Sequence, residues 1–262
     1  MPQSLGFITD VAIRRLEGST VTRRDGYQVI STAANPRFWW GNFMLLDAPP
    51  ASGSTATWLD LFAAEFPAAE HVALGIDTTD MDLPVPDDFA AAGFSVDRSV
   101  VLTADAATDP PHPSAGVEIR PLSSDADWQQ AASLSMSIAE EEGATPDPAF
   151  ETARAAARRQ LAGQGHGAWF GAFDDGRLLG QLGLFRAGDG YARYQDVATD
   201  PAARRRGIAG TLVCHAARYG LGTLAVKRLV IVADQEGPAI ALYRACGFAD
   251  TEGQVSLSRP PE

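Results

Sequence analysis

The sequence has few cysteines and no long apolar run. Its 262 residues include two cysteines, Cys214 and Cys246, which is too few for a disulfide framework or a zinc cluster, so we expect no metal site. No apolar run approaches the ~18–20 residues of a membrane-spanning helix. The first residues show no basic region followed by an apolar core, so we expect no secretory signal. These absences predict a cytoplasmic protein without a membrane partner.

Lysine is almost missing as well, since Lys227 is the only one. Arginine therefore carries nearly all of the positive charge. With 33 acidic against 21 basic residues the formal net charge is −12, and such a surface repels the phosphate backbone of nucleic acids. We therefore expect no nucleic-acid partner, whereas cationic amines are compatible with this charge. Basic residues cluster once, at 204–206.

One stretch has the composition of a linker. Residues 104–115 combine three prolines with small and polar residues and show no apolar period, which predicts an extended, solvated segment. We expect this linker, 105–115, to separate a domain at 1–104 from a domain at 116–262, both of ordinary domain size.

Hydrophobic patterning in the second half predicts an α+β fold with a mixed sheet. The expected strands are 117–122, 168–173, 177–185, 191–199, 227–233 and 255–258, the last of them at the sheet edge. The expected helices are 125–142, 148–161, 206–219 and 238–246. Asp125 and Asp147 are the expected N-caps of the first two helices.

The first half weakly repeats the second. His71–Asp77 parallels 229–234, and the Phe89, Gly93 and Phe94 spacing parallels that of Tyr243, Gly247 and Phe248. Upstream, 38–46 is strand-like and 57–66 is helix-like. This pattern predicts an internal repeat whose first copy is eroded. We expect Phe38, Trp39 and Trp40 to be core residues.

The stretch from Thr199 to Gly210 has the pattern of an anion site. An expected strand ends at Thr199, a short loop follows, and an expected helix begins near Arg206. The first amides of a helix have no intrahelical acceptor and lie at the positive end of the helix dipole, so they bind anions. Gly207 and Ala209 are small, which would let a diphosphate approach the backbone. The adjacent arginines would add charge-assisted hydrogen bonds.

This stretch resembles the signature of the GNAT superfamily of acyl-CoA N-acyltransferases, and the resemblance covers nearly all of 116–262. Arg204, Gly207 and Ala209 match Q/R-x-x-G-x-G/A. A second block, A-x-x-x-Y-x-x-x-G-F, is matched by Ala239, Tyr243, Gly247 and Phe248. Other phosphate motifs do not fit, since the sequence has neither a G-K-[ST] loop nor G-x-G-x-x-G after a first strand.

The resemblance implies two GNAT-like domains, each a mixed, mostly antiparallel sheet flanked by helices, with acetyl-CoA as the acyl donor. It implies that the backbone of Val197, Ala198 and Thr199 pairs with the pantetheine arm, and that Tyr243 protonates the departing thiolate. The residues implied at the pyrophosphate are Arg204, Arg205, Arg206, Gly207, Ile208, Ala209 and Gly210. Glu236 stands where the family often has an asparagine that contacts the cofactor, which puts that contact in doubt.

The general base is not identified by the resemblance. The family's frequent base positions correspond to Arg193 and Gln195, and neither is a good base. Glu140, Glu141 and Glu142, at the end of one expected helix, are candidates, although such a run is more often a solvated helix end. Asp196 and a water relay are candidates as well.

The remaining chemically interesting residues have structural explanations. His166 and His215 have no partners at ligand spacing, and both cysteines lie on apolar helix faces and are expected in the core. In the first half, prolines after residue 47 remove amide donors, and Phe89 cannot donate a proton. We therefore expect residues 1–104 to be a degenerate, non-catalytic copy.

Together these observations predict an acetyl-CoA-dependent N-acetyltransferase acting by direct attack of an amine of a small-molecule acceptor. The alternative is a non-catalytic acyl-CoA-binding or sensing protein. The sequence identifies neither the acceptor nor the oligomeric state.

Overall fold

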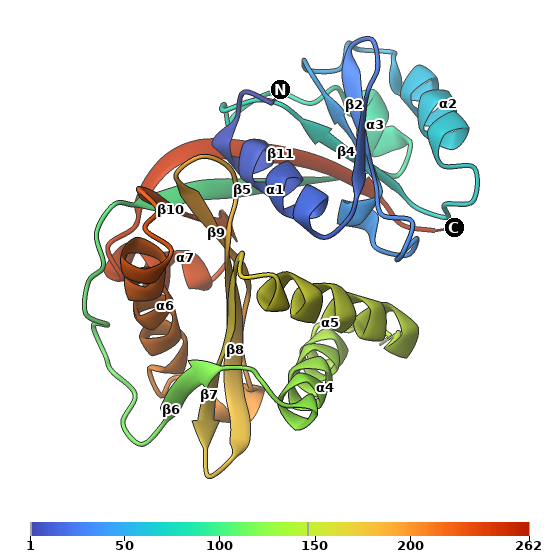
Figure 1. Cartoon of the computed structure of the whole chain (residues 1–262). Helices are drawn as coiled ribbons and strands as arrows, with labels where there is room; N and C mark the ends of the chain where they lie inside the picture. The colour runs from blue at the N-terminus through green and yellow to red at the C-terminus, as the bar shows by residue number, and fades with distance from the viewer. Residues whose placement is uncertain (1, 146, 262) are drawn as a thin grey trace. The chain divides into compact units, whose positions relative to one another are not determined.

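The computed structural model describes residues 2–145 and 147–261, and their contacts form two compact units. Unit 1 comprises Met1–Val101, Val232–Gly237 and Thr251–Glu262, and unit 2 comprises Leu102–Ile231 and Pro238–Asp250 (Figure 1). This division differs from the expected boundaries. The segment 251–262 belongs with unit 1, because its residues pair with a strand of the first half.

Unit 1 is a mixed sheet with helices on both faces. In chain order its elements are α1 (Leu5–Leu16), β1 (Thr20–Arg23), β2 (Tyr27–Ser31), a 3-10 turn (Trp39–Gly41), β3 (Phe43–Leu46), α2 (Thr55–Glu65), β4 (Val72–Ile76), α3 (Asp87–Ala91), most of β5 (Ser95–Ala104) and most of β11 (Ala249–Arg259). The strand order is β1-β2-β3-β4-β11-β5. Strands β3 and β4 are parallel, whereas β1 with β2, β2 with β3, and β4 with β11 are antiparallel.

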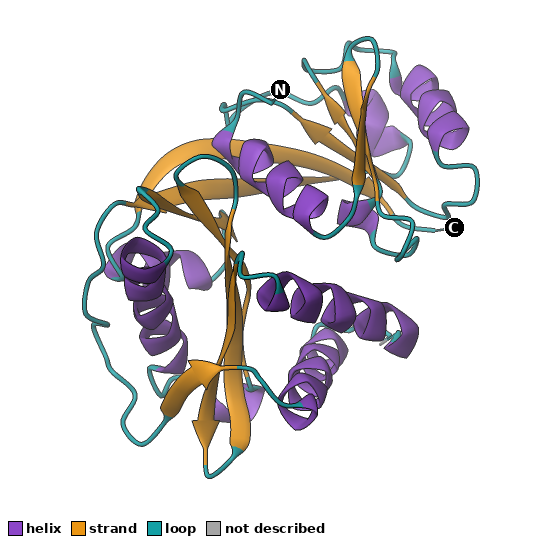
Figure 2. Cartoon of the chain, in the orientation of Figure 1, coloured by secondary structure: helices purple, strands orange, loops and turns teal. Residues whose placement is uncertain are grey.

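Alternating side chains fill two cores on the two faces of the unit 1 sheet. Val29 and Met44 pack with α2 and α3 residues such as Phe62. Their neighbours Ile30 and Leu45 pack with α1 residues on the other face. Helices are seen on both faces of this sheet in Figure 2.

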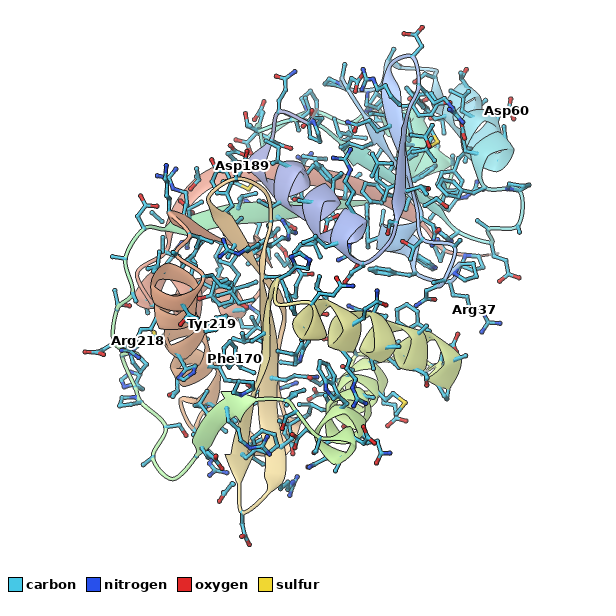
Figure 3. The ribbon with its side chains drawn as sticks, viewed as in Figure 1. Arg37, Asp60, Phe170, Asp189, Arg218 and Tyr219 are labelled. Carbon is cyan, nitrogen blue, oxygen red and sulfur yellow. The ribbon has the colours of Figure 1, made fainter. Side chains whose placement is uncertain are left out.

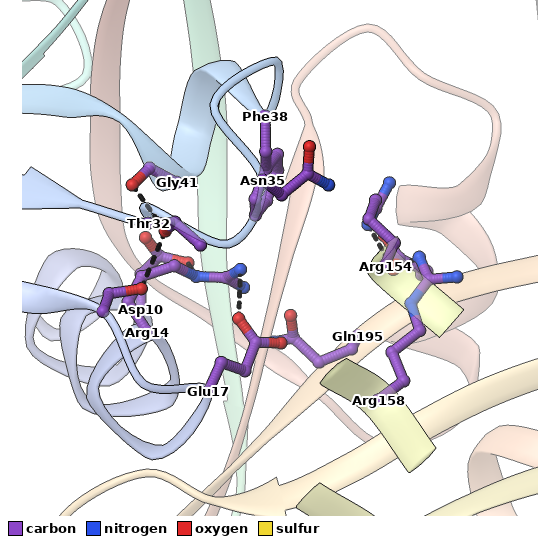
Figure 4. A network of polar contacts seen from close by, with 12 residues as sticks. Asp10, Arg14, Glu17, Thr32, Asn35, Phe38, Gly41, Arg154, Arg158 and Gln195 are labelled. Atoms are coloured by element: carbon purple, nitrogen blue, oxygen red, sulfur yellow. Dashed lines mark hydrogen bonds and ion pairs between the residues drawn. The ribbon is translucent and has the colours of Figure 1, made fainter. Parts of the chain in front are cut away.

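The expected strand 38–46 begins later than predicted. The tryptophans Trp39 and Trp40 lie in the 3-10 turn, and β3 begins at Phe43. Both are partly buried and pack against the α1-side core. Phe38 is partly buried as well, so the three residues border the core and are not fully buried core residues as expected. Next to them, Thr32 Oγ1 donates to the Gly41 carbonyl at 2.7 Å (Figure 4).

Two helices of unit 1 are capped by carboxylates that are distant in sequence. Asp77 accepts hydrogen bonds from the backbone N–H groups of Gln3 and Ser4, just before α1. Asp88, from α3, accepts from the N–H of Gly53 and from both the N–H and the hydroxyl of Thr55, where α2 begins. These carboxylates neutralise the positive helix ends.

Unit 2 is a mixed sheet in the order β10-β9-β8-β7-β6. Its elements are β6 (Glu118–Pro121), α4 (Asp125–Glu141), α5 (Pro148–Gly163), β7 (Gly167–Asp174), β8 (Arg177–Arg186), β9 (Tyr191–Thr199), a 3-10 turn (Pro201–Ala203), α6 (Ile208–Arg218), a π turn (Tyr219–Thr223), β10 (Arg228–Asp234, ending in unit 1) and α7 (Ala239–Ala245). Among the described strand pairs from β6 to β10, only β9 and β10 are parallel. Helices α4 and α5 cover one face of this sheet, and α6 and α7 cover the other (Figure 1).

The predicted α+β fold with a mixed sheet flanked by helices is confirmed, with local corrections at element ends. The N-cap of α4 is Ser124 rather than Asp125, because Ser124 and Asp127 form a reciprocal capping box. Asp147 caps α5 as predicted, accepting from the amides of Ala149 and Phe150.

Gln181 forms a hydrogen-bond network in the core of unit 2. Gln181, which is fully buried, accepts from Trp169 Nε1 at 3.0 Å and donates to the Ala131 carbonyl at 3.0 Å. This network ties β8 to β7 and α4, because each group would be costly to bury without a partner.

The expected linker is a strap that is hydrogen-bonded to helices of unit 2. Thr108 Oγ1 donates to the Cys246 carbonyl at 2.7 Å, and the Ser114 amide donates to Thr211 Oγ1 at 2.9 Å. Arg218, on α6 (Figure 3), pairs with Asp109. The strap is largely exposed, as predicted, but its composition did not reveal these bonds to α6 and α7.

Strand β11 is not an edge strand. It lies between β4 and β5, and Val255–Arg259 pair antiparallel with Ile76–Val72. Val255 and Leu257 are fully buried. The alternating pattern of 255–258 predicted a strand but carried no information about which strands lie beside it.

Candidate functional site

A cavity of about 760 Å³ in unit 2 contains most of the predicted cofactor-binding residues. Its walls come from the end of α4, the end of β9, the start of α6, and α7. The lining residues are Ile138, Glu141, Glu142, Val197, Ala198, Thr199, Arg204, Arg205, Gly207, Ile208, Ala209, Gly210, Pro238, Ala239 and Leu242.

One wall of the cavity is a strand edge with free backbone groups. Among the described residues, pairing between β9 and β10 covers only Tyr191–Arg193 with Arg228–Val230. On its other edge β9 stays paired with β8, where Thr199 and Ala198 face Gly180 and Gln181. The edge of Val197–Thr199 that lies away from β8 is therefore available to an extended ligand.

Thr199 contributes a further unsatisfied group. Its Oγ1 is buried and has no hydrogen-bond partner among the residues described. A buried hydroxyl without a partner is unfavourable, so a polar ligand atom in this cavity would stabilise it.

The start of α6 forms the anion-binding part of the cavity. The first α-helical bond runs from the Thr211 amide to the Gly207 carbonyl, so the amides of Ile208, Ala209 and Gly210 have no partner within the helix. They sit at the positive end of the α6 dipole. This arrangement is the one predicted for a diphosphate.

The structure adds a second reason for glycine at position 207. Gly207 has φ +76°, and a Cβ placed there would lie 2.1 Å from the His112 carbonyl of the strap. Its small size is therefore required by the left-handed backbone and by the packed strap. Gly207 also lines the cavity, where its small size would let a diphosphate approach the backbone as predicted.

The three loop arginines differ in their surroundings. Arg204 lines the cavity and forms a two-pronged ion pair with Glu141 at the end of α4. Arg205 lines the cavity, has a left-handed backbone (φ +64°), and has no ion pair within the described part of the chain. Arg206 pairs with Asp174 at 3.3 Å and is not among the lining residues.

Tyr243 lies in α7 directly after Leu242, which lines the cavity, but Tyr243 itself is not among the lining residues. Only 6% of its surface is exposed. Burial raises the pKa of the Tyr243 phenol to about 12. Its hydroxyl therefore keeps its proton at physiological pH, as a general acid must.

Glu236 is not among the residues that line the cavity. It belongs to unit 1 and lines a separate hollow of about 380 Å³ with Asp234 and Arg98. The geometry of unit 2 therefore gives the predicted cofactor contact of Glu236 no support.

The candidate bases fall into different environments. Glu140 is not among the lining residues, and Glu141 is paired with Arg204. Asp196 is held by two arginines of α5. Glu142 lines the cavity and forms no ion pair with any residue that the structure describes.

The histidine and cysteine predictions agree with the structure. His215 packs edge-on against Phe170, with ring centroids 5.1 Å apart, and burial lowers the pKa of its imidazole. Cys214 and Cys246 are buried and free, and the Cys246 thiol donates to the Cys214 sulfur, which raises the pKa of Cys246.

Within 2–145 and 147–261 no group of three or more histidine, cysteine, aspartate or glutamate side chains is arranged to hold a metal ion. None of the helices described there is long and apolar enough to cross a membrane.

The apolar wall of the cavity was missed by the sequence reasoning. Ile138, Pro238 and Leu242 line it beside the predicted residues. Their positions in the sequence could have indicated this wall, because Leu242 is next to Tyr243 and Ile138 lies one turn before the acidic end of its helix.

Comparison with known proteins supports the predicted family for this part of the chain. Residues 132–248 match the model of the Acetyltransferase (GNAT) family. No curated protein matches the sequence.

Several solved structures share the fold. A functionally unknown conserved protein from Staphylococcus epidermidis is 10% identical, with a TM-score of 0.70 over 93% of this chain and 95% of that one. A GCN5-related N-acetyltransferase from Kribbella flavida is 17% identical, with a TM-score of 0.62 over 99% and 98%. A tandem GNAT protein from the clavulanic acid biosynthesis pathway is 16% identical, with a TM-score of 0.55 over 89% and 78%.

At these sequence identities the similarity to solved structures shows the fold alone. The family model, in contrast, matches the segment that contains the residues lining the cavity. The family and fold suggest acyl transfer. Residues 132–248 match the GNAT acetyltransferase family model, and they lie in a chain whose fold resembles that of a GCN5-related N-acetyltransferase.

Proposed function

We propose that unit 2 transfers an acetyl group from acetyl-CoA to an amine of a small-molecule acceptor. The observation that carries this proposal is the joining of two features in one cavity. The free strand edge at Val197–Thr199 and the free amides at the start of α6 both line it. The first suits an extended amide-containing arm, and the second suits a diphosphate.

The residues present fit the donor. Val197–Thr199 offer strand-like hydrogen bonds to the pantetheine arm, and Thr199 Oγ1 is a buried group that needs a partner. Ile208, Ala209 and Gly210 offer amides to the pyrophosphate, supplemented by the Arg205 guanidinium. Acetyl-CoA supplies a thioester whose carbonyl carbon is attacked by an amine.

Three groups of the protein would carry the proton and charge movements. A strand amide near Val197 would stabilise the developing oxyanion. Glu142 would accept the proton lost by the attacking amine. Tyr243 would donate its proton to the departing sulfur.

The choice of Glu142 has a direct test with a matched control. Glu142→Gln should lower kcat by roughly 10²–10⁴-fold, the usual contribution of a general base. Glu140→Gln removes a neighbouring carboxylate outside the cavity and should leave kcat close to wild type. Equal effects of the two substitutions would point to a water relay instead.

We further propose that the N-terminal half is a degenerate GNAT-like copy. The order β1-β2-β3-α2-β4-α3-β5 repeats β7-β8-β9-α6-β10-α7-β11, and β3 with β4 is parallel, like β9 with β10. Where α6 offers free amides, the start of α2 already binds the Asp88 carboxylate.

We also propose that the protein acts in the cytoplasm.

The test of function is release of free thiol from acetyl-CoA in the presence of polyamines, aminoglycosides, amino acids and peptide N-termini, each compared with acetyl-CoA alone. Two arginine variants make the test specific to the cavity. Arg205→Gly keeps the left-handed backbone but removes a charged donor, so acetyl-CoA should bind roughly 10–100-fold more weakly. Arg206→Gln should bind acetyl-CoA like wild type, and equal weakening in both variants would refute the placement of the diphosphate.

A non-catalytic acyl-CoA sensor is the second candidate. It is favoured by the absence of Tyr243 from the cavity lining and by Arg193 and Gln195 at the strand positions where a base is frequent. Tight acetyl-CoA binding in calorimetry, with no amine-dependent thiol release across the panel, would establish the sensor.

A further inference from the structure

Strand β9 contains a bulge immediately before the residues that line the cavity. Pairing with β8 shifts by one residue between Gln181–Ala198 and Gly183–Gln195, so β9 has one extra residue there. The extra residue coincides with Asp196, whose φ is +44°. A left-handed backbone is unfavourable at a residue other than glycine, so surrounding contacts must hold it.

Two arginines of α5 hold the carboxylate at this bulge. Oδ2 of Asp196 accepts from Arg154 at 2.7 Å and also from Arg158. The two arginines are four residues apart and therefore lie on one face of α5. Figure 4 shows them side by side.

The ion pair of Arg158 with Asp196 differs from a surface ion pair because the Arg158 side chain is buried. Only 6% of its side chain is exposed, and its guanidinium lies over the Trp169 ring, 4.6 Å from the centroid. Burial lowers the pKa of this arginine. A buried charge is costly unless it is paired, so Arg158 favours the conformation that brings the Asp196 carboxylate to it.

The bulge also determines the backbone orientation of the next residue, Val197, which does not pair with β8. Val197 follows Asp196 directly and has no partner on β8, because the pairs resume at Ala198. Its backbone thus lines the cavity in an orientation set by the residue before it.

We propose that Arg154, Arg158 and Asp196 form a positioning cluster, which directs the Val197 amide toward the carbonyl oxygen of the bound thioester. The inference rests on the proposed function for the identity of that ligand. It assigns no proton transfer to Asp196, which acts here through the backbone.

The cluster is tested by removing charge while keeping the backbone conformation. Asn tolerates a left-handed φ much as Asp does, so Asp196→Asn isolates the ion pairs. Arg158→Gln removes the buried guanidinium, Arg158→Lys is the conservative rescue, and Arg159→Gln is the control, since Arg159 pairs with Asp125 instead. We expect kcat to fall about 10–100-fold in Asp196→Asn and in Arg158→Gln, while the acetyl-CoA dissociation constant changes less than about 3-fold. Arg158→Lys should recover part of the lost kcat, and Arg159→Gln should leave kcat unchanged.

A second measurement needs no turnover. A directed Val197 amide contacts the acetyl carbonyl, which CoA lacks, so the ratio of the CoA and acetyl-CoA dissociation constants reports on it. We expect wild type to prefer acetyl-CoA and Asp196→Asn to lose that preference. A lower melting temperature with unchanged kcat and unchanged ratio would show a merely structural role and overturn the proposal, as would a wild type without any preference. A wild type that prefers acetyl-CoA but transfers no acetyl group would instead refute the proposed function, and the ratio would still decide the role of the cluster.

Discussion

At the scale of single residues, Tyr243 is the side chain whose chemistry can be stated most sharply. Replacing it with Phe removes the phenolic proton while keeping the ring that fills the buried position. We expect kcat to fall by roughly 10²–10⁴-fold with acetyl-CoA affinity nearly unchanged. Steady-state kinetics and calorimetry on the same preparation check both parts. Wild-type kcat, with the chemical step shown to limit the rate, would remove Tyr243 from the mechanism.

The pH dependence follows from the same residue. Burial raises the pKa of Tyr243 to about 12, so the phenol stays protonated where an exposed tyrosine, of pKa about 10, would ionise. The acid form therefore persists as pH rises from 10 toward 12, and Tyr243 should cause no loss of kcat up to about pH 10. The kcat profile checks this, and an alkaline loss with an apparent pKa below 10 that Tyr243→Phe abolishes would contradict it.

At the scale of elements, the capping box of α4 controls the helix that brings Glu141 and Glu142 to the cavity. Ser124 Oγ accepts from the Asp127 amide at 3.1 Å, so Ser124→Ala should lower the free energy of unfolding by about 0.5–2 kcal/mol. Ser123→Ala changes an adjacent exposed serine and should have little effect. Denaturant unfolding of both variants makes the comparison, which fails if the two losses are equal.

Asp127 adds a pH signature to the same helix end. The Arg120 guanidinium, with the amides of Ser123 and Ser124, lowers the pKa of the Asp127 carboxyl below its ordinary 3.8. Because the pKa of this carboxyl is lower in the folded than in the unfolded chain, its contribution to stability is fully present above pH 3.8. That contribution is lost as the pH falls below 3.8 toward the pKa of the folded state. The acid loss should therefore be smaller in Asp127→Asn than in wild type.

The elements themselves were largely predictable in the second half and less so in the first. Strand β9 was expected at 191–199 and lies there, because apolar alternation and flanking turn residues mark both ends. Helix α1 and strands β1, β2 and β5 were not predicted, since tertiary packing rather than a clear period or cap defines them. The bulge at Asp196 was also invisible, because one inserted residue leaves the composition of a strand unchanged.

The candidate site likewise contains a part that was predictable from the sequence and a part that was not. The loop at 204–210 and the end of β9 were predictable because they depend on neighbours in sequence. Glu236 and Tyr243 depend on how distant elements pack, so the cavity lining differs from the expectation at those positions.

At the scale of the whole molecule, the two halves predict one donor per chain. The start of α6 offers free amides, whereas the start of α2 is already bound to Asp88. Calorimetric titration of the full chain with acetyl-CoA should therefore give a stoichiometry of one. A value of two would show that the first half retains a working site.

The place of β11 has a consequence for how the protein is made. Unit 1 is assembled from residues 1–101, 232–237 and 251–262, and β11 supplies an interior strand between β4 and β5. A ribosome releases residues 72–76 long before 255–259 are synthesised. During translation β4 must therefore wait with an unpaired edge, a condition that invites aggregation. Unit 1 can complete its sheet only after residues 255–259 have emerged from the ribosome, so its folding waits for a segment that is synthesised more than 150 residues after its own first hundred.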